Sequence, residues 1–127
     1  MMKIPETIRE AWEHREGPIV LSTVAGDGTP NIIYATCVSL YGENRLVVAD
    51  NYFDKTRTNI KAGECKGAAL FMTNDKKAYQ LKGSLEYHSA GPVFEDMKKW
   101  NPPTHPGHGA AALVIKEIYT GAKRLAP

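Results

Sequence analysis

The 127-residue sequence fits a single domain and is long enough to bury a hydrophobic core. Hydrophobic residues make up 43% and charged residues 24%, and the formal net charge of +2 is too small to favour nucleic acid or a membrane surface as a partner. No apolar stretch approaches the ~20 residues of a membrane span, and the charged N-terminal segment lacks the apolar core of a signal peptide. We therefore predict one cytoplasmic domain over residues 1–127 that binds neither nucleic acid nor membrane.

The first half of the sequence has the pattern of one amphipathic helix followed by strands joined by short turns. Apolar residues recur at helical spacing over residues 4–14, and Gly17-Pro18 predicts the end of this helix. Asp27-Gly28 lies between two apolar runs and is a strong hairpin signal. The strands expected in this half span residues 19–24, 31–40 and 45–50.

The second half alternates short helices with longer strands. A short helix is expected to begin with Asp54 as its N-cap and to stop at Gly63. Gly83 interrupts an alternating strand and predicts a β-bulge or a close backbone approach. The remaining elements expected here are a strand at 65–73, a strand at 78–88, a helix at 91–100, an irregular loop at 101–109 and a strand-forming segment at 110–125 with room for a second short strand.

Together these elements predict a mainly β fold of six to seven antiparallel strands with about three short helices at its periphery. Tight turns between successive strands favour antiparallel pairing over parallel crossovers. So many strands in a small chain tend to curl into a barrel, because closure removes exposed sheet edges.

The segment "ADNYFDKTRTNI" at residues 49–60 concentrates hydrogen-bond donors at a strand-to-helix junction. A helix N-terminus attracts anions, whereas Lys55 and Arg57 in a first turn oppose the helix dipole unless an anion compensates them. Thr56 adds a hydroxyl donor. Two interpretations stay open from the residues alone: a phosphate site, or a solvated turn capped by Asp54.

Other potential motifs carry less information. His105 and His108 have an H-x-x-H spacing in a Gly/Pro-rich loop, which favours a flexible or interface loop over a metal site. Cys37 and Cys65 lack the C-x-x-C spacing of a redox or zinc site, so reduced thiols are expected. Dinucleotide-binding, P-loop and nucleophile-elbow motifs are absent from the sequence. No metal site is expected, and no catalytic residue is assigned.

The order of elements, together with the segments "DGTPN", "VVADNYFDKTRTNI" and "LKG", resembles the pyridoxamine 5′-phosphate oxidase-like FMN-binding split-barrel family. The similarity extends from about Ile4 to Ile118 and is greatest to the small FMN-binding proteins and flavin reductase-like members. It implies a split β-barrel and a homodimer that holds FMN at the subunit interface. The cofactor contacts that it implies are Tyr34, Ala35, Thr36, Cys37, Ala49, Asp50, Asn51, Lys55, Thr56, Arg57 and Gln80.

Within this set, the resemblance assigns the FMN phosphate to Lys55 and Thr56, with Arg57 as a further candidate, and places Gln80 near the dimer partner. The sequence departs from the true oxidase at Asp54 and Tyr34, where that enzyme carries arginines, and it lacks the basic substrate-binding tail. Oxidation of pyridoxamine phosphate itself is therefore not expected.

The function that we expect is an FMN-binding flavoprotein, either a small oxidoreductase or an electron carrier that works by hydride or electron transfer. The alternative from a different class is a non-catalytic split-barrel module that binds haem or a deazaflavin in place of FMN. The redox partner and the enzymatic status stay open at this stage.

Overall fold

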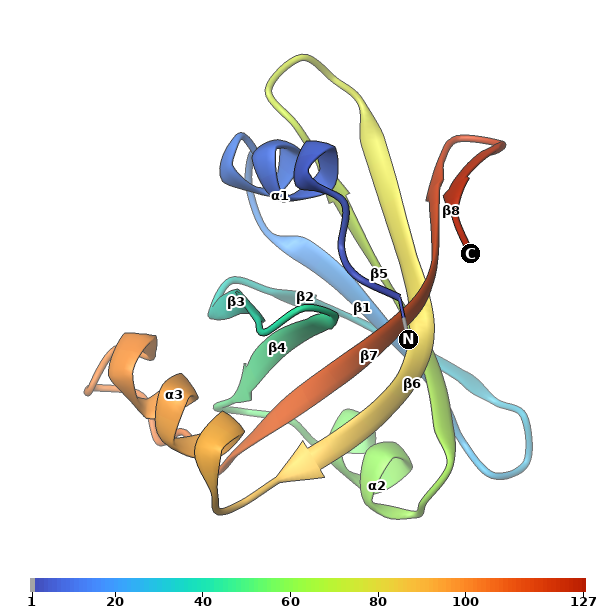
Figure 1. Ribbon diagram of the computed structural model, residues 1–127. Helices are drawn as coiled ribbons and strands as arrows, with labels where there is room; N and C mark the ends of the chain where they lie inside the picture. The colour runs from blue at the N-terminus through green and yellow to red at the C-terminus, as the bar shows by residue number, and fades with distance from the viewer. Residues whose placement is uncertain (1) are drawn as a thin grey trace.

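Eight strands and three helices make up the computed structural model, which describes residues 2–127 (Figure 1). In chain order they are α1 (Glu6–Glu13), β1 (Ile19–Val24), β2 (Pro30–Ala35), β3 (Val38–Tyr41), β4 (Arg45–Asp50), α2 (Lys55–Lys61), β5 (Cys65–Met72), β6 (Ala78–His88), α3 (Pro92–Trp100), β7 (Gly109–Thr120) and β8 (Lys123–Ala126). No helix in the described part of the chain is long and apolar enough to span a membrane.

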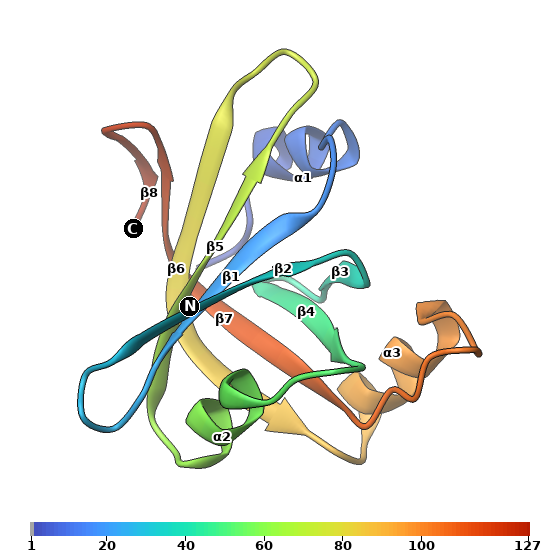
Figure 2. The same cartoon turned by 180° about the vertical axis from the view of Figure 1, so that it is seen from behind.

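The strands form one curled antiparallel sheet in the order β2-β1-β5-β6-β7-β4-β3, with β8 added beside β7. β2 and β3 are the two edge strands of this curled sheet, and the helices lie around the outside (Figures 1 and 2). This arrangement confirms the predicted mainly β split barrel. The expectation that closure removes the sheet edges is wrong, because β2 and β3 each pair on one side only.

Alternating apolar residues fill the inside of the curled sheet. Leu21, Leu46, Leu81 and Leu113 are fully buried there, as the period of two in a strand requires. A second, smaller cluster lies on the other face of β4 and β7, where α3 packs its Val93 and Met97 side chains, among others, against the alanines of β7. Because both of their faces are covered, β4 and the first half of β7 are almost continuously buried.

The predicted strand at 31–40 is instead two strands, separated at Thr36 and Cys37. β2 pairs with β1 whereas β3 pairs with β4, so the chain passes directly from one end of the sheet to the other. The backbone N–H of Ala49 donates to the carbonyl oxygen of Cys37 at 2.9 Å and holds this crossing against β4. The barrel is split at this crossing, between β2 and β3.

Most other predicted boundaries are confirmed. β1, β4 and β6 begin and end at the predicted residues, and Gly63 follows α2 with a φ of 96° that favours glycine. The first helix is shorter than predicted, since it ends at Glu13 and not at Gly17-Pro18.

The predicted irregularity at Gly83 is also confirmed. The register between β6 and β7 shifts between Lys82 and Gly83, and a Cβ atom on Gly83 would lie 1.8 Å from the carbonyl oxygen of Val114. Only glycine allows the two strands to approach this closely.

We predict that Gly83→Ala lowers the free energy of unfolding by about 1–3 kcal/mol, because the added methyl group forces β6 and β7 apart. Denaturant unfolding monitored by circular dichroism measures the change. Gly26→Ala is the matched control, since a Cβ atom at Gly26 meets nothing within 4 Å. Equal stability of the two variants would contradict this account of the bulge.

Candidate functional site

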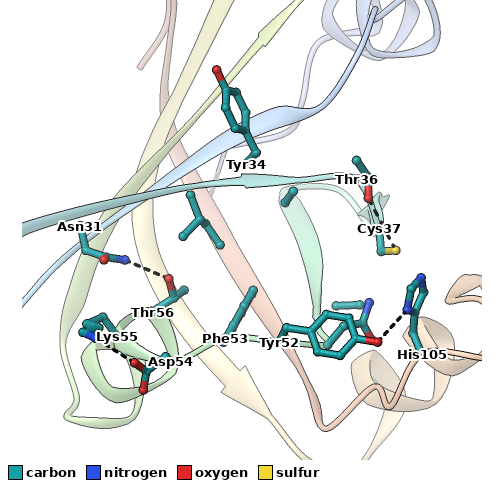
Figure 3. Close-up of a pocket in the computed structure, with 14 residues that line it drawn as sticks. Asn31, Tyr34, Thr36, Cys37, Tyr52, Phe53, Asp54, Lys55, Thr56 and His105 are labelled. Carbon is teal, nitrogen blue, oxygen red and sulfur yellow. Dashed lines mark hydrogen bonds and ion pairs between the residues drawn. The ribbon is translucent and has the colours of Figure 1, made fainter.

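A pocket of about 440 Å³ opens at the split of the barrel, between β2, the end of β4 and the turn that leads into α2 (Figure 3). Its volume lies within the range of small-molecule sites. Both polar and apolar side chains form its wall. The lining residues are Asn31, Ile33, Tyr34, Ala35, Thr36, Cys37, Ala49, Asn51, Tyr52, Phe53, Asp54, Lys55, Thr56 and His105.

One end of the pocket is formed by the first turn of α2, where Thr56 is buried. Its Oγ1 accepts a hydrogen bond from Asn31 Nδ2 at 2.9 Å, so the hydroxyl proton remains available to donate. Asn59, on the same helix, donates from Nδ2 to Thr23 Oγ1 at 2.9 Å and ties α2 to β1. The polar network holds the start of α2 in a fixed position against two strands.

The two charged residues of the pocket wall pair with each other. Lys55 Nζ donates to Asp54 Oδ2 at 2.9 Å, and both side chains are largely exposed. This hydrogen bond and the charge of Lys55 lower the pKa of Asp54, and Asp54 in turn raises the pKa of Lys55.

The predicted capping role of Asp54 is wrong. Asp54 occupies the N-cap position of α2, but its carboxylate makes no capping hydrogen bond. Its φ of −132° and ψ of −88° depart from the extended backbone that N-cap residues usually adopt. The carboxylate that accepts a backbone N–H at this turn belongs to Asp50, whose Oδ1 accepts from the Phe53 N–H at 3.1 Å.

The Asp50 carboxylate is fully buried behind the turn and is saturated with donors. Arg57 donates from Nε to Oδ2 at 2.6 Å and from Nη2 to Oδ1 at 2.9 Å, and the Tyr87 hydroxyl donates to Oδ2 at 2.6 Å. Burial opposes ionisation of Asp50, but these hydrogen bonds outweigh it and hold its pKa below the ordinary value. Burial and the neighbouring Asp50 together raise the pKa of Tyr87 to about 12.

The opposite end of the pocket is closed by the loop between α3 and β7. His105, on this loop, packs edge-on against Tyr52 with ring centroids 5.8 Å apart, and Tyr52 Oη lies 3.3 Å from His105 Nδ1 (Figure 3). These contacts hold the segment that was predicted as a flexible or interface loop against the turn that follows β4. Within residues 2–127, no group of three or more His, Cys, Asp or Glu residues is placed to hold a metal ion.

A buried pair of asparagines anchors this loop to the end of β4. Asn51 Nδ2 donates to Asn101 Oδ1 at 3.0 Å, and Asn101 Nδ2 donates to Asn51 Oδ1 at 2.9 Å. The Gly107 N–H also donates to Asn51 Oδ1, and the His108 N–H donates to the Asp50 carbonyl oxygen. Residues about 50 positions apart in sequence therefore form adjoining walls of the pocket.

The structure brings together eight of the eleven residues expected to contact a cofactor: Tyr34, Ala35, Thr36, Cys37, Ala49, Asn51, Lys55 and Thr56. Asp50 and Arg57 lie behind the pocket wall in their ion pair, and Gln80 lies on β6 outside the lining. Six further lining residues were missed by sequence reasoning, namely Asn31, Ile33, Tyr52, Phe53, Asp54 and His105. Tyr52 and Phe53 lie inside the donor-rich segment 49–60, whereas the H-x-x-H spacing of His105 predicted a flexible or interface loop and not a place in this pocket.

A curled antiparallel sheet with a pocket at its split defines a split-barrel domain. The model of the pyridoxamine 5′-phosphate oxidase family matches residues 4–120, nearly the whole chain. The protein therefore belongs to this family, as its sequence resemblance predicted. A search of curated proteins found no match.

Solved structures with the same fold include HupZ from Group A Streptococcus, which is 19% identical and has a TM-score of 0.81 over 98% of each chain. An FMN-binding protein from Syntrophomonas wolfei subsp. wolfei is 22% identical, with a TM-score of 0.75 over 91% of this chain and 84% of its own. An F420 reductase is 20% identical, with a TM-score of 0.68 over 91% of this chain and 98% of its own. At these identities the similarity establishes the fold.

We predict that Asn101→Ala lowers the free energy of unfolding by about 1–3 kcal/mol, because it leaves the buried Asn51 amide without its partner. Amide hydrogen exchange should also become faster at Gly107 and His108, whose N–H groups depend on the anchored loop. Asn74→Ala is the control, because the exposed Asn74 side chain makes no hydrogen bond within the described residues. Unchanged exchange at both amides would show that the asparagine pair does not anchor the loop.

Proposed function

We propose that the protein is an FMN-binding flavoprotein that acts as a small oxidoreductase or electron carrier. The observation that carries this proposal is the composition of the pocket at the split. Lys55 and Thr56 offer an ammonium group and a hydroxyl proton at one end, and apolar side chains form much of the remaining wall.

The donors at the start of α2 fit the phosphate of FMN. An ammonium group, a hydroxyl group and the N-terminal turn of a helix all favour a negatively charged oxygen. Because Asn31 and Asn59 fix the position of this turn, little ordering would be required on binding. Lys55 and Thr56 are therefore the residues that would hold the phosphate.

The apolar part of the wall fits a flat ring system. Ile33, Ala35, Ala49 and Phe53 are apolar residues of the wall, and Asn51 adds an amide near the anchored loop. These residues would bind and orient the flavin and exclude water from one of its sides. Bound FMN supplies hydride or single-electron transfer, and the protein sets its position and electrostatic surroundings.

We also infer that two copies of the chain form the working unit. An apolar strip crosses the outer face of β2, β1 and β5, which lie side by side in Figure 2. Tyr34 pairs with Val20, which pairs in turn with Leu70, and Ile32 lies on the same face. Ile32 and Tyr34 are 70% and 77% exposed. Contact of a patch of large apolar side chains with water is unfavourable, so we expect another molecule to cover this face.

The strip continues into the pocket, which supports a second copy as its partner. Tyr34 lines the pocket, and its ring projects from β2 to the side opposite Lys55 and Thr56 (Figure 3). A second copy seated on the strip would therefore complete the pocket wall at the edge where a single chain leaves it open.

Visible absorption spectroscopy of the purified protein tests the cofactor. We expect a flavin spectrum, release of FMN on denaturation, and a melting temperature that rises with added FMN through mass action. A Soret band would instead favour the haem-binding alternative, and tighter binding of a deazaflavin would favour that cofactor. A colourless protein whose melting temperature does not respond to FMN would contradict the proposal.

We predict that Ile32→Glu yields a monomer that binds FMN weakly, because a carboxylate on the apolar strip opposes the covering of this face. Light scattering measures the mass, which for the unmodified protein should be twice that of the chain. Leu125→Glu, on β8 away from the strip, is the control and should remain dimeric. A monomeric unmodified protein that still binds FMN would refute the dimer and leave the cofactor proposal intact.

A further inference from the structure

The charges on the pocket wall cancel. Lys55 is the lysine and Asp54 the aspartate among the lining residues, and their side chains are already joined by a 2.9 Å ion pair. An anion that approaches the start of α2 therefore meets a carboxylate as well as an ammonium group.

Arg57 cannot restore the positive charge, although it lies in the same helical turn. Two of its nitrogens donate to the Asp50 carboxylate, which is fully buried and depends on this guanidinium for its neutralisation. Turning Arg57 toward the pocket would leave a buried, unpaired carboxylate, which is strongly destabilising. Of Lys55 and Arg57, Lys55 is thus the side chain that a phosphate in the pocket can recruit.

The Lys55–Asp54 pair is of a kind that exchanges readily. Both side chains are largely exposed, at 77% and 81%, and exposed ion pairs contribute little to stability. A phosphate can therefore displace the Asp54 carboxylate from Lys55. The displaced carboxylate is attached to the neighbouring residue, so it remains close to the bound phosphate and repels it.

We propose that Asp54 is a specificity-determining residue that competes with the ligand's phosphate for Lys55. This competition weakens the binding of FMN but not of riboflavin, and so reduces the preference of the pocket for FMN. This inference rests on the proposed flavin-binding function. It adds that the pocket tolerates flavins with and without a phosphate, because the loss of the Lys55–Asp54 ion pair offsets part of the binding energy that Lys55 gains from the phosphate.

The test compares FMN and riboflavin, which differ only in the phosphate. Titration of flavin-free protein at low ionic strength, followed by flavin fluorescence, gives both dissociation constants. Asp54→Asn should tighten FMN binding about fivefold, as expected for one exposed charge pair, and leave riboflavin binding unchanged. The gain should shrink in high salt, which screens exposed charges.

Glu43→Gln is the matched control. It removes one negative charge and breaks an exposed ion pair with Lys3 of the same kind, at 3.4 Å, outside the pocket. It should change neither dissociation constant. An equal gain in FMN affinity for Glu43→Gln and Asp54→Asn would assign the effect to net charge and overturn the proposal.

A double-mutant cycle with Lys55→Met tests the competition itself. Lys55→Met alone should weaken FMN binding about tenfold through the lost charge-assisted hydrogen bond. In the Lys55→Met background, Asp54→Asn should increase the affinity for FMN by much less than fivefold, because no ammonium group remains to be released from the carboxylate. A gain of full size in that background would mean direct repulsion alone and would overturn the proposed competition.

The outcomes separate this inference from the function on which it rests. If neither flavin binds to the unmodified protein or to Asp54→Asn, the flavin-binding proposal fails, and the role of Asp54 fails with it. If FMN binds but the ratio of the two dissociation constants is the same in both proteins, only the role of Asp54 is refuted.

Discussion

The buried carboxylate of Asp50 is the interaction on which the pocket depends. It ends β4, accepts the Phe53 N–H at the following turn, and receives Arg57 from α2 and Tyr87 from β6. A charge buried this deeply is tolerated only when it is paired and fully hydrogen-bonded. The same requirement fixes the direction in which the chain leaves the sheet, and so sets where Lys55 and Thr56 lie.

This arrangement divides the basic residues of one helical turn between two tasks. Arg57 neutralises a buried group and is committed to the fold, whereas Lys55 is exposed and held only by its neighbour Asp54. Sequence spacing places the two cations in the same turn and cannot separate them. The difference comes from Asp50 and Tyr87, which lie seven residues before and thirty residues after Arg57 in the sequence.

The strands could be predicted where local pattern determines them, as in β1, β4 and β6. The break at Thr36 and Cys37 could not, because both residue types suit a strand and the break arises from pairing with two different distant strands. Residues 49–60 could likewise be recognised from local sequence as a segment rich in hydrogen-bond donors. The place of His105 in the pocket could not be predicted, because it depends on long-range contacts such as the Asn51–Asn101 pair, which joins residues 50 positions apart.

The crossing at Thr36 and Cys37 has a mechanical consequence. It joins the two ends of the sheet, and the Ala49–Cys37 backbone hydrogen bond secures it to β4. Elsewhere along the sheet, neighbouring strands are joined by whole ladders of such bonds. Thr36, Cys37 and Ala49 all line the pocket, so a shift of this crossing relative to β4 would change the width of the pocket while leaving the β5–β6–β7 ladders intact.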